Sequence, residues 1–211
     1  MTALEVVVRG TARRRYPAER ATAGLAAQVE GPDRDGVYRK ALGVHEPLGR
    51  DLSALSEAGA VTRWSSDQLR VFSFRGTGRR LMYRVSIKLE AEFTDFEQLS
   101  AFLDRWAGTE GVEVGYIGWD VTEDNRRRYE ADLRADAVAD AVAKAQAFAD
   151  AVGRGAVRAV RLADPGLLGA ADMPFAQARS FAGGQARSGP LELRPDDIEI
   201  DAEVEARFAA D

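Results

Sequence analysis

The stretch LMYRVSIKLEAEF, residues 81–93, decides the fold class of this chain. Its odd-numbered residues are apolar throughout, and its even-numbered residues, apart from Met82, are polar or charged. A period of two is typical of a strand with one face on a core and the other in water, as in antiparallel sheets. Residues 81–93 therefore predict a half-buried strand of an antiparallel sheet.

The neighbouring residues 61–75 predict the partner of this strand in a β-hairpin. The two segments are joined by a short stretch that contains Gly76-Thr77-Gly78, and glycine readily takes the positive φ that tight turns require. The same glycines do not predict a phosphate-binding loop, because they lie between two strands and lack the remaining glycines of that motif.

Further segments alternate in the same way and predict strands over 4–9, 20–30, 112–121 and 198–208, and another strand is expected over 156–163. The alternation changes phase near Gly115, which predicts a β-bulge. Arg13 to Pro17 are expected to form a turn. The last strand carries an acidic row, which we expect to be its wet face and to protect it from pairing edge to edge; the row consists of Glu199, Asp201, Glu203 and Glu205.

Three regions have helical patterns. Residues 33–58 predict two short helices, because Gly43, Pro47 and Gly49 interrupt the pattern, and Gly59 is expected to end it. Residues 95–107 predict an amphipathic helix. Residues 124–152 predict one long helix ended by Gly153. Its expected buried stripe is Ala131, Ala135, Val138, Val142, Ala145 and Ala149, widened by Leu133, Ala137, Ala141, Phe148 and Val152.

These elements predict an α+β fold in a single domain over residues 1–211, with a twisted antiparallel sheet backed by one long Ala-rich helix and shorter helices. Residues 164–190 are rich in Gly, Ala and Pro and are expected to be a flexible segment. Met173, Phe175 and Phe181 are apolar residues within it that nothing local would bury. We expect them to form contacts between subunits of a homo-oligomer.

The composition excludes several kinds of chemistry. The chain has no cysteine, so disulfides, thiol catalysis and cysteine-based metal sites are ruled out. Its only histidine, His45, has no second histidine or nucleophile motif beside it in sequence and is expected to be structural or solvent-exposed. The sequence thus predicts no catalytic residue, no metal site and no cofactor. No stretch reaches the 18 or so apolar residues that span a bilayer, so we expect no membrane span.

Three arginine clusters stand out in a chain of net charge −5: Arg13–Arg15, Arg75 with Arg79 and Arg80, and Arg126–Arg128. The net charge argues against a dedicated nucleic-acid binder. Arg126, Arg127 and Arg128 lie in the first turn of the long helix, where the helix dipole disfavours cations. We expect nearby acidic residues, Glu123, Asp124 and Glu130, to compensate them. The alternative is that Arg126–Arg128 bind an anion.

The order of these segments resembles the SIMPL-domain family. The resemblance rests on Val6-x-Val8-x-Gly10, on the Ala131–Gly153 helix, and on Pro195-Asp196-Asp197-Ile198-Glu199-Ile200 leading into the last strand. Known members are mostly exported, some form large homo-oligomers, and some are linked to protection against oxidative stress. The resemblance implies self-assembly and a stress role. The family has no established catalytic residues.

The N-terminus departs from the family because residues 1–10 have no basic region followed by an apolar run, so we expect a cytoplasmic protein. Three functional hypotheses stay open. The first is a non-enzymatic, self-assembling module whose protein partner is unknown. The second is a small-molecule or anion-binding protein, conceivably an enzyme, with its site under the 164–190 segment. The third is a weak nucleic-acid or phosphoprotein binder that uses the arginine clusters.

Overall fold

The computed structural model of the chain describes residues 4–168 and 193–211. The described chain divides into two compact units. Unit 1 consists of residues 4–16, 122–168 and 197–211, and unit 2 consists of residues 17–121 and 193–196. The α+β class with antiparallel strands is confirmed, and the strands form two sheets. That the whole chain behaves as a single domain stays a prediction.

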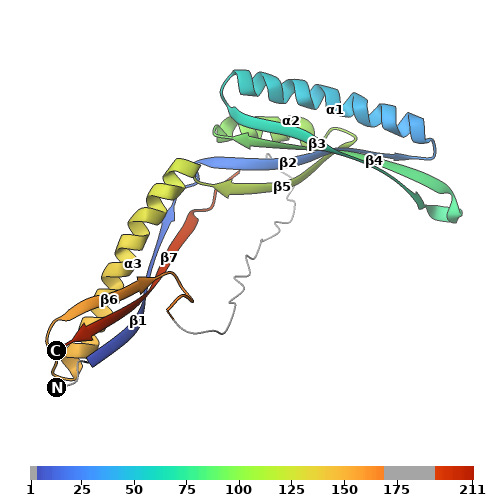
Figure 1. Cartoon of the computed structure of the whole chain (residues 1–211). Helices are drawn as coiled ribbons and strands as arrows, with labels where there is room; N and C mark the ends of the chain where they lie inside the picture. Colours follow the sequence, from blue (N-terminus) through green and yellow to red (C-terminus); the bar gives the residue numbers. More distant parts are fainter. Residues whose placement is uncertain (1–3, 169–192) are drawn as a thin grey trace. The chain divides into compact units, whose positions relative to one another are not determined.

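Unit 1 is a three-stranded antiparallel sheet with one long helix along it (Figure 1). Its strands are β1 (Leu4–Tyr16), β6 (Val157–Ala163) and β7 (Ile198–Ala210), and β7 lies between the other two. The helix is α3 (Glu123–Ala151), and Gly153 beyond its end has a φ of 70°. The predicted long helix and its glycine stop are thus confirmed.

Small residues let α3 approach β1 very closely. A Cβ atom built on Gly10 would lie 2.0 Å from the Ala137 carbonyl oxygen and 2.7 Å from the Ala141 Cβ. The buried row of α3 is Leu133, Ala137, Ala141, Ala145 and Ala149. All five belong to the predicted stripe or its widening and are confirmed. The prediction was wrong for other members, which are exposed: Ala131, Ala135, Val142, Phe148 and Val152. Alanines four residues apart fit over the glycine, where a valine would not.

Arginines of β1 face the acidic row of β7. Arg13 and Arg15 both pair with Glu199, at 3.1 and 3.3 Å, and Arg9 pairs with Glu205 at 3.1 Å. The expected turn at Arg13 to Pro17 was wrong, since β1 continues to Tyr16 along this ladder. The acidic row does not guard a free edge either, because β7 is the central strand; it complements the arginines of its neighbour.

The free edge of β1 is covered by side chains of α3. The Thr11 N–H donates to Asp140 Oδ2 at 2.8 Å, and Lys144 Nζ donates to the Arg9 carbonyl at 3.0 Å. Lys144 also pairs with Asp140, and the hydrogen bonds from Lys144 and Thr11 lower the pKa of Asp140. These bonds satisfy backbone groups that an edge strand otherwise leaves open to another chain.

Unit 2 is a four-stranded antiparallel sheet in the order β3-β4-β2-β5. The strands are β2 (Arg20–Gly31), β3 (Val61–Arg75), β4 (Leu81–Phe93) and β5 (Val112–Asp120). The helices are α1 (Arg34–Glu57) and α2 (Phe96–Ala107), with a short 3-10 turn, η1 (Thr77–Arg79), at the hairpin tip. The predicted hairpin, its positive-φ glycine (Gly78, 70°) and the helix over 95–107 are confirmed.

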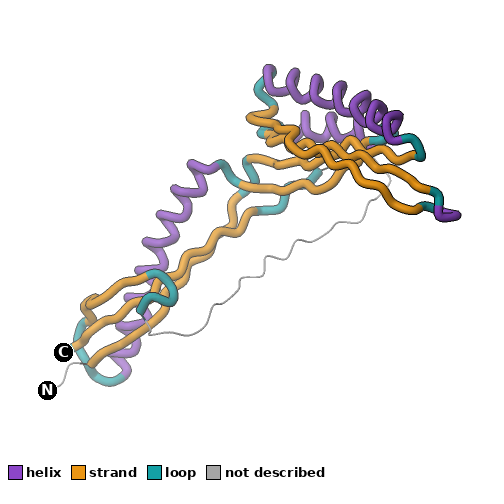
Figure 2. The backbone as a smooth tube through the Cα atoms, turned by 45° about the vertical axis from the view of Figure 1, so that its right-hand side comes forward, coloured by secondary structure: helices purple, strands orange, loops and turns teal. Residues whose placement is uncertain are grey.

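Both helices pack on one face of this sheet, and the opposite face carries no helix (Figures 1 and 2). The core joins Leu48 and Leu52 of α1 and Leu99, Phe102 and Leu103 of α2 to the inward residues of β2 and β4. On β4 these inward residues run from Val85 to Phe93, in the register that the alternation predicted. Ser86 and Glu92 of the polar face are nevertheless buried.

Helix α1 is a single helix, so the prediction of two short helices was wrong. Its buried residues Val37, Ala41, Leu48 and Leu52 stay on one face across Pro47. Burial of this continuous row outweighs the one hydrogen bond that a proline removes from the helix. Asp33 caps the first turn by accepting from the N–H groups of Asp35 and Gly36.

No helix in the described part of the chain is long and apolar enough to cross a membrane. Residues 169–192 lie outside the described residues, and most of the segment predicted to be flexible falls there. The described beginning of that segment is tied to unit 1. The Leu168 N–H donates to Glu205 Oε2 at 3.2 Å, and hydrogen bonds from the backbone of Gly166 and Leu168 lower the pKa of Glu205.

Candidate functional site

Two β-bulges lie at the same level of the four-stranded sheet, one on each side of the β2–β4 pair. On β5, Gly115 and Tyr116 together face Gly24, because Ala23 pairs with Ile117 and Leu25 pairs with Val114. On β3, residues 66 and 67 together face Leu89. Gly24 and Leu89 are on adjacent rungs of the β2–β4 pair. Bulges bend the strand that carries them and are common next to functional sites.

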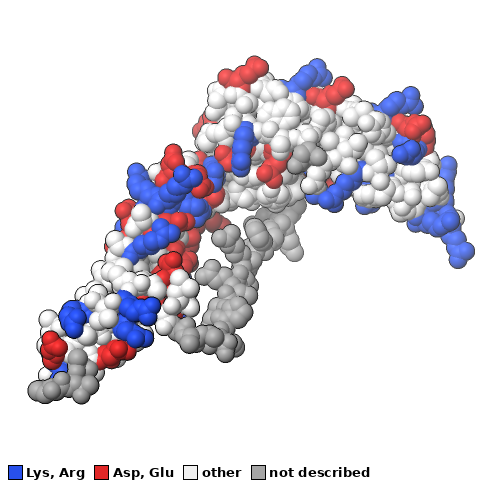
Figure 3. All heavy atoms as spheres, viewed as in Figure 1, with Lys and Arg blue, Asp and Glu red and all other residues white. Residues whose placement is uncertain are grey.

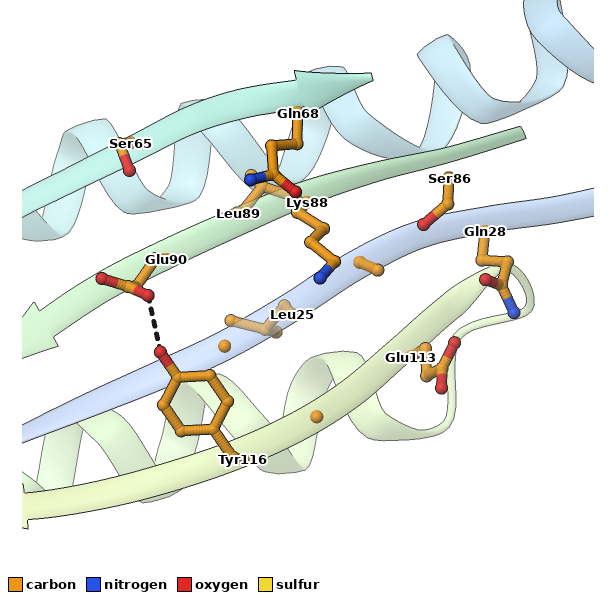
Figure 4. Close-up of a pocket in the computed structure, with 13 residues that line it drawn as sticks. Leu25, Gln28, Ser65, Gln68, Ser86, Lys88, Leu89, Glu90, Glu113 and Tyr116 are labelled. Atoms are coloured by element: carbon orange, nitrogen blue, oxygen red, sulfur yellow. Dashed lines mark hydrogen bonds between the residues drawn. The ribbon is translucent and has the colours of Figure 1, made fainter. Parts of the chain in front are cut away.

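A hollow of about 590 Å³ lies between the two bulges, on the sheet face that carries no helix. Small residues of the central strands, Gly24, Ala26 and Ser86, form part of its lining, together with Gly115 of β5. Longer polar side chains line the rest and are labelled in Figure 4; they are Gln28, Gln68, Lys88, Glu90, Glu113 and Tyr116. Small residues therefore form the bottom of the hollow, and longer polar side chains form its edge.

Tyr116 closes one end of the hollow. Its ring lies against Gly24, where a built Cβ atom would come within 2.7 Å of the ring. Its hydroxyl donates to Glu90 Oε2 at 2.5 Å, so the side chain bridges from β5 across β2 to β4 (Figure 4). This hydrogen bond from the phenol to Glu90, with burial and the negative charge of Glu90 adding to it, raises the pKa of Tyr116. The ring is thus held in one position although it is 54% exposed.

We expect Tyr116→Phe to lower the stability by roughly 1 kcal/mol near neutral pH, since it removes one half-exposed hydrogen bond to a charged acceptor. The tyrosine pKa is higher in the folded chain than its ordinary 10.0. The stabilisation is therefore complete below pH 10 and is lost as the pH rises through the raised value. Melting temperatures of both proteins, measured from pH 7 to pH 11, check this; a difference that does not shrink above pH 10 contradicts it.

Lys88 and Glu113 face each other across the middle of the hollow. Ala26 pairs with Lys88 on one side and with Glu113 on the other, so the two charged residues share a rung with only a methyl group between them. Neither forms an ion pair with a side chain that the structure describes. The charged groups of Lys88 and Glu113 are thus separated by the small side chain of Ala26.

Comparison with models of protein families shows to which family the chain belongs. The family model SIMPL, described as a protein of unknown function (DUF541), matches residues 6–208. The chain belongs to the SIMPL family. No curated protein matches it. Because the family description assigns no function, the functional argument for this SIMPL chain has to come from its own residues.

Helix α3 of the SIMPL chain begins at Glu123, so Arg126 ends its first turn, and Arg127 and Arg128 lie in the second turn rather than in the predicted first. Arg127 pairs with Glu123 at 3.4 Å, and the Arg128 guanidinium lies 5.2 Å from the centre of the Tyr129 ring. Tyr129 in turn stacks on Tyr16 at 3.7 Å. The Glu123 pair is one of the local pairings expected from the sequence. Anion binding by Arg126, Arg127 and Arg128 stays a prediction.

The other predicted residues lie elsewhere. Arg75, Arg79 and Arg80 are exposed at the tip of the β3–β4 hairpin, where Figure 3 shows basic side chains together. Met173, Phe175 and Phe181 lie outside the described residues, and so does most of the segment expected to cover a ligand site. Contacts between subunits through these three residues stay a prediction.

His45 of α1 has a partner that its sequence neighbourhood does not show. Its Nε2 lies 2.7 Å from Ser66 Oγ, so the hydrogen bond ties the β3 bulge to α1. A catalytic Ser-His pair also needs a group that orients the other ring nitrogen. No described side chain is bonded there, and no three described acidic or histidine side chains converge to hold a metal ion.

Sequence reasoning missed the hollow, although two signals of it were present. The phase change at Gly115 predicted the β5 bulge, which is confirmed. The polar face of residues 81–93 supplied Ser86, Lys88 and Glu90, but it was interpreted only as a wet surface. The β3 bulge has no comparable signal, since Ser65 to Gln68 are all polar and show no change of phase.

Proposed function

We propose that this SIMPL chain is a non-enzymatic module that works as a homo-oligomer, in which a second copy pairs with it along β3. A link to stress protection is part of the same proposal and is supported by the family resemblance alone. The observation that carries the self-assembly is the surface of the β3–β4 hairpin.

Strand β3 is an edge of its sheet, and large apolar side chains are exposed along the hairpin. Leu69, Val71 and Phe72 of β3 and Leu81 of β4 have exposed fractions between 39% and 50%. The β2–β4 pairing stops at Tyr83, so the hairpin runs beyond the end of β2 (Figure 2). A long edge strand with exposed apolar residues is a ready site for pairing with another chain.

The two edge strands β1 and β3 differ in how their edges are covered, and this difference supports a specific role for β3. Side chains of α3 cover backbone groups on the free edge of β1, as the bonds from Thr11 and Lys144 show. On β3 the exposed positions include the apolar Leu69, Val71 and Phe72 among polar residues and arginines. A second copy that adds its own β3 would bury these side chains and extend the sheet through backbone hydrogen bonds.

The test is the mass of the protein in solution. We expect light scattering after size-exclusion chromatography to give a multiple of the 22.9 kDa chain mass for the wild type. The double variant Leu69→Lys/Phe72→Lys should be a monomer, because two charges cannot be buried in the interface without partners.

The matched control is Phe148→Lys/Val152→Lys, which replaces one aromatic and one aliphatic residue that are 59% and 61% exposed at the C-terminal end of α3. This control should keep the mass of the wild type. A monomeric wild type at high concentration would overturn the proposal, and so would equal masses for the wild type and the β3 variant.

A further inference from the structure

The geometry of the hollow points to a binding site for a small zwitterion of the α-amino-acid class, with its carboxylate on Lys88 and its ammonium group on Glu113. This inference concerns a ligand and does not depend on the proposed self-assembly. It rests on the arrangement of the rungs, on the charges at the rim and on the way in which Tyr116 is fixed.

The pairing of the strands sets the distance between Lys88 and Glu113. Lys88, Ala26 and Glu113 follow one another on β4, β2 and β5. Neighbouring strands are about 4.8 Å apart, so the Lys88 and Glu113 backbones are roughly 10 Å apart across the Ala26 methyl group. Figure 4 shows Lys88 reaching from β4 toward β2, with Glu113 on the far side. The space between them suits a charged group of a few atoms.

The balance of charge selects a zwitterion over a simple ion. An anion bound at Lys88 would be repelled by Glu90 and Glu113, which also line the hollow. A cation bound at Glu113 would be repelled by Lys88, and Glu90 already accepts the hydrogen bond of Tyr116. A molecule that carries both charges satisfies both residues with charge-assisted hydrogen bonds, which are about twice as strong as neutral ones.

The remaining walls suit the rest of such a molecule. Gln68 lies beside Lys88 on the same rung, and Gln28 lies two rungs away on β2, so both amides can donate to or accept from polar atoms. Tyr116 offers a flat ring, and its bond to Glu90 keeps it from turning. An aromatic wall with a few fixed polar groups is typical of small-molecule sites.

The experiment is a titration of the whole chain with the common free L-α-amino acids, followed by the shifts of backbone amide signals in NMR spectra. We expect at least one amino acid to shift signals of the rungs around Ala26. Its N-acetyl derivative, which lacks the ammonium group, and its amide, which lacks the carboxylate, should each bind at least roughly tenfold more weakly.

Variants of the two charged residues test the same assignment from the protein side. Lys88→Met and Glu113→Gln should each weaken binding at least roughly tenfold. The matched controls Lys40→Met and Glu97→Gln change exposed residues on α1 and α2 and should bind as the wild type does. All four positions are exposed, so the variants should keep the fold, which their spectra verify.

Three results would overturn the inference. The first is that no amino acid shifts any signal of the hollow. The second is that the N-acetyl derivative or the amide binds as well as the free amino acid, which would mean a site for a simple ion. The third is that Lys88→Met and Glu113→Gln bind like their controls. None of these results bears on the mass measurements of the β3 variant.

Discussion

Gly10→Ala is expected to destabilise unit 1 by about 3 kcal/mol, toward the upper end of the cost of overpacking. The new Cβ atom would lie 2.0 Å from the backbone oxygen of Ala137, so the helix has to move as a body. A shift of α3 also loosens the row of buried alanines below it. Thermal unfolding followed by circular dichroism should show the melting temperature falling by roughly 10 °C.

Gly43→Ala is the matched control for this substitution. Gly43 is also a glycine of a regular element, but a Cβ atom built on it meets nothing within 4 Å. Because it lies inside α1, alanine should stabilise the chain by about 0.5–1 kcal/mol. A Gly10→Ala protein that melts like the wild type would show that α3 does not approach β1 as closely as described.

Leu133→Asp is expected to cost roughly 4 kcal/mol, because it places a carboxylate without a partner at a fully buried position of α3. Urea unfolding should show a lower midpoint with an unchanged slope. The substitution also tests which face of the helix is inside, since the sequence pattern placed Leu133 at the margin of the buried stripe and the structure places it in the buried row.

Val142→Asp on the same helix is its control. The sequence pattern expects Val142 in the centre of the buried stripe, whereas the structure leaves it 41% exposed. We therefore expect Val142→Asp to change the free energy of unfolding by less than about 1 kcal/mol. Equal costs for Leu133→Asp and Val142→Asp would mean that α3 is rotated about its axis.

Elements with strong local signals could be predicted from the sequence. The hairpin of 61–75 and 81–93, the helix over 95–107 and the bulge at Gly115 are examples, because each depends on residues close together in the chain. The orientation of α3 could not be predicted in this way. Its rows of alanine look alike on several faces, and the choice between them depends on Gly10, which is more than a hundred residues away in sequence.

Alternation does not reveal which strands pair or in which register. The division of the strands into two sheets and the formation of the hollow both depend on that pairing. A period of two shows which face of a strand is apolar but not which strand lies beside it. One signal of the partition was present: arginines recur at every second residue from Arg9 to Arg15 except at Thr11, and acids do so from Glu199 to Glu205. Complementary rows of this kind predict neighbouring strands. The hollow needs two bulges at one level, which only the assembled sheet shows.

The pairing of β1 with β7 has a consequence for the order in which the chain folds during synthesis. Leu4 pairs with Ala210, so β1 is synthesised long before β7, the strand that pairs with it in the described sheet. Every strand and helix of unit 2 lies between residues 17 and 121, and that unit can assemble while translation continues. Until residues 198–210 emerge, the edge of β1 that β7 occupies has no partner strand, whereas α3, which is made earlier, can already cover the opposite edge.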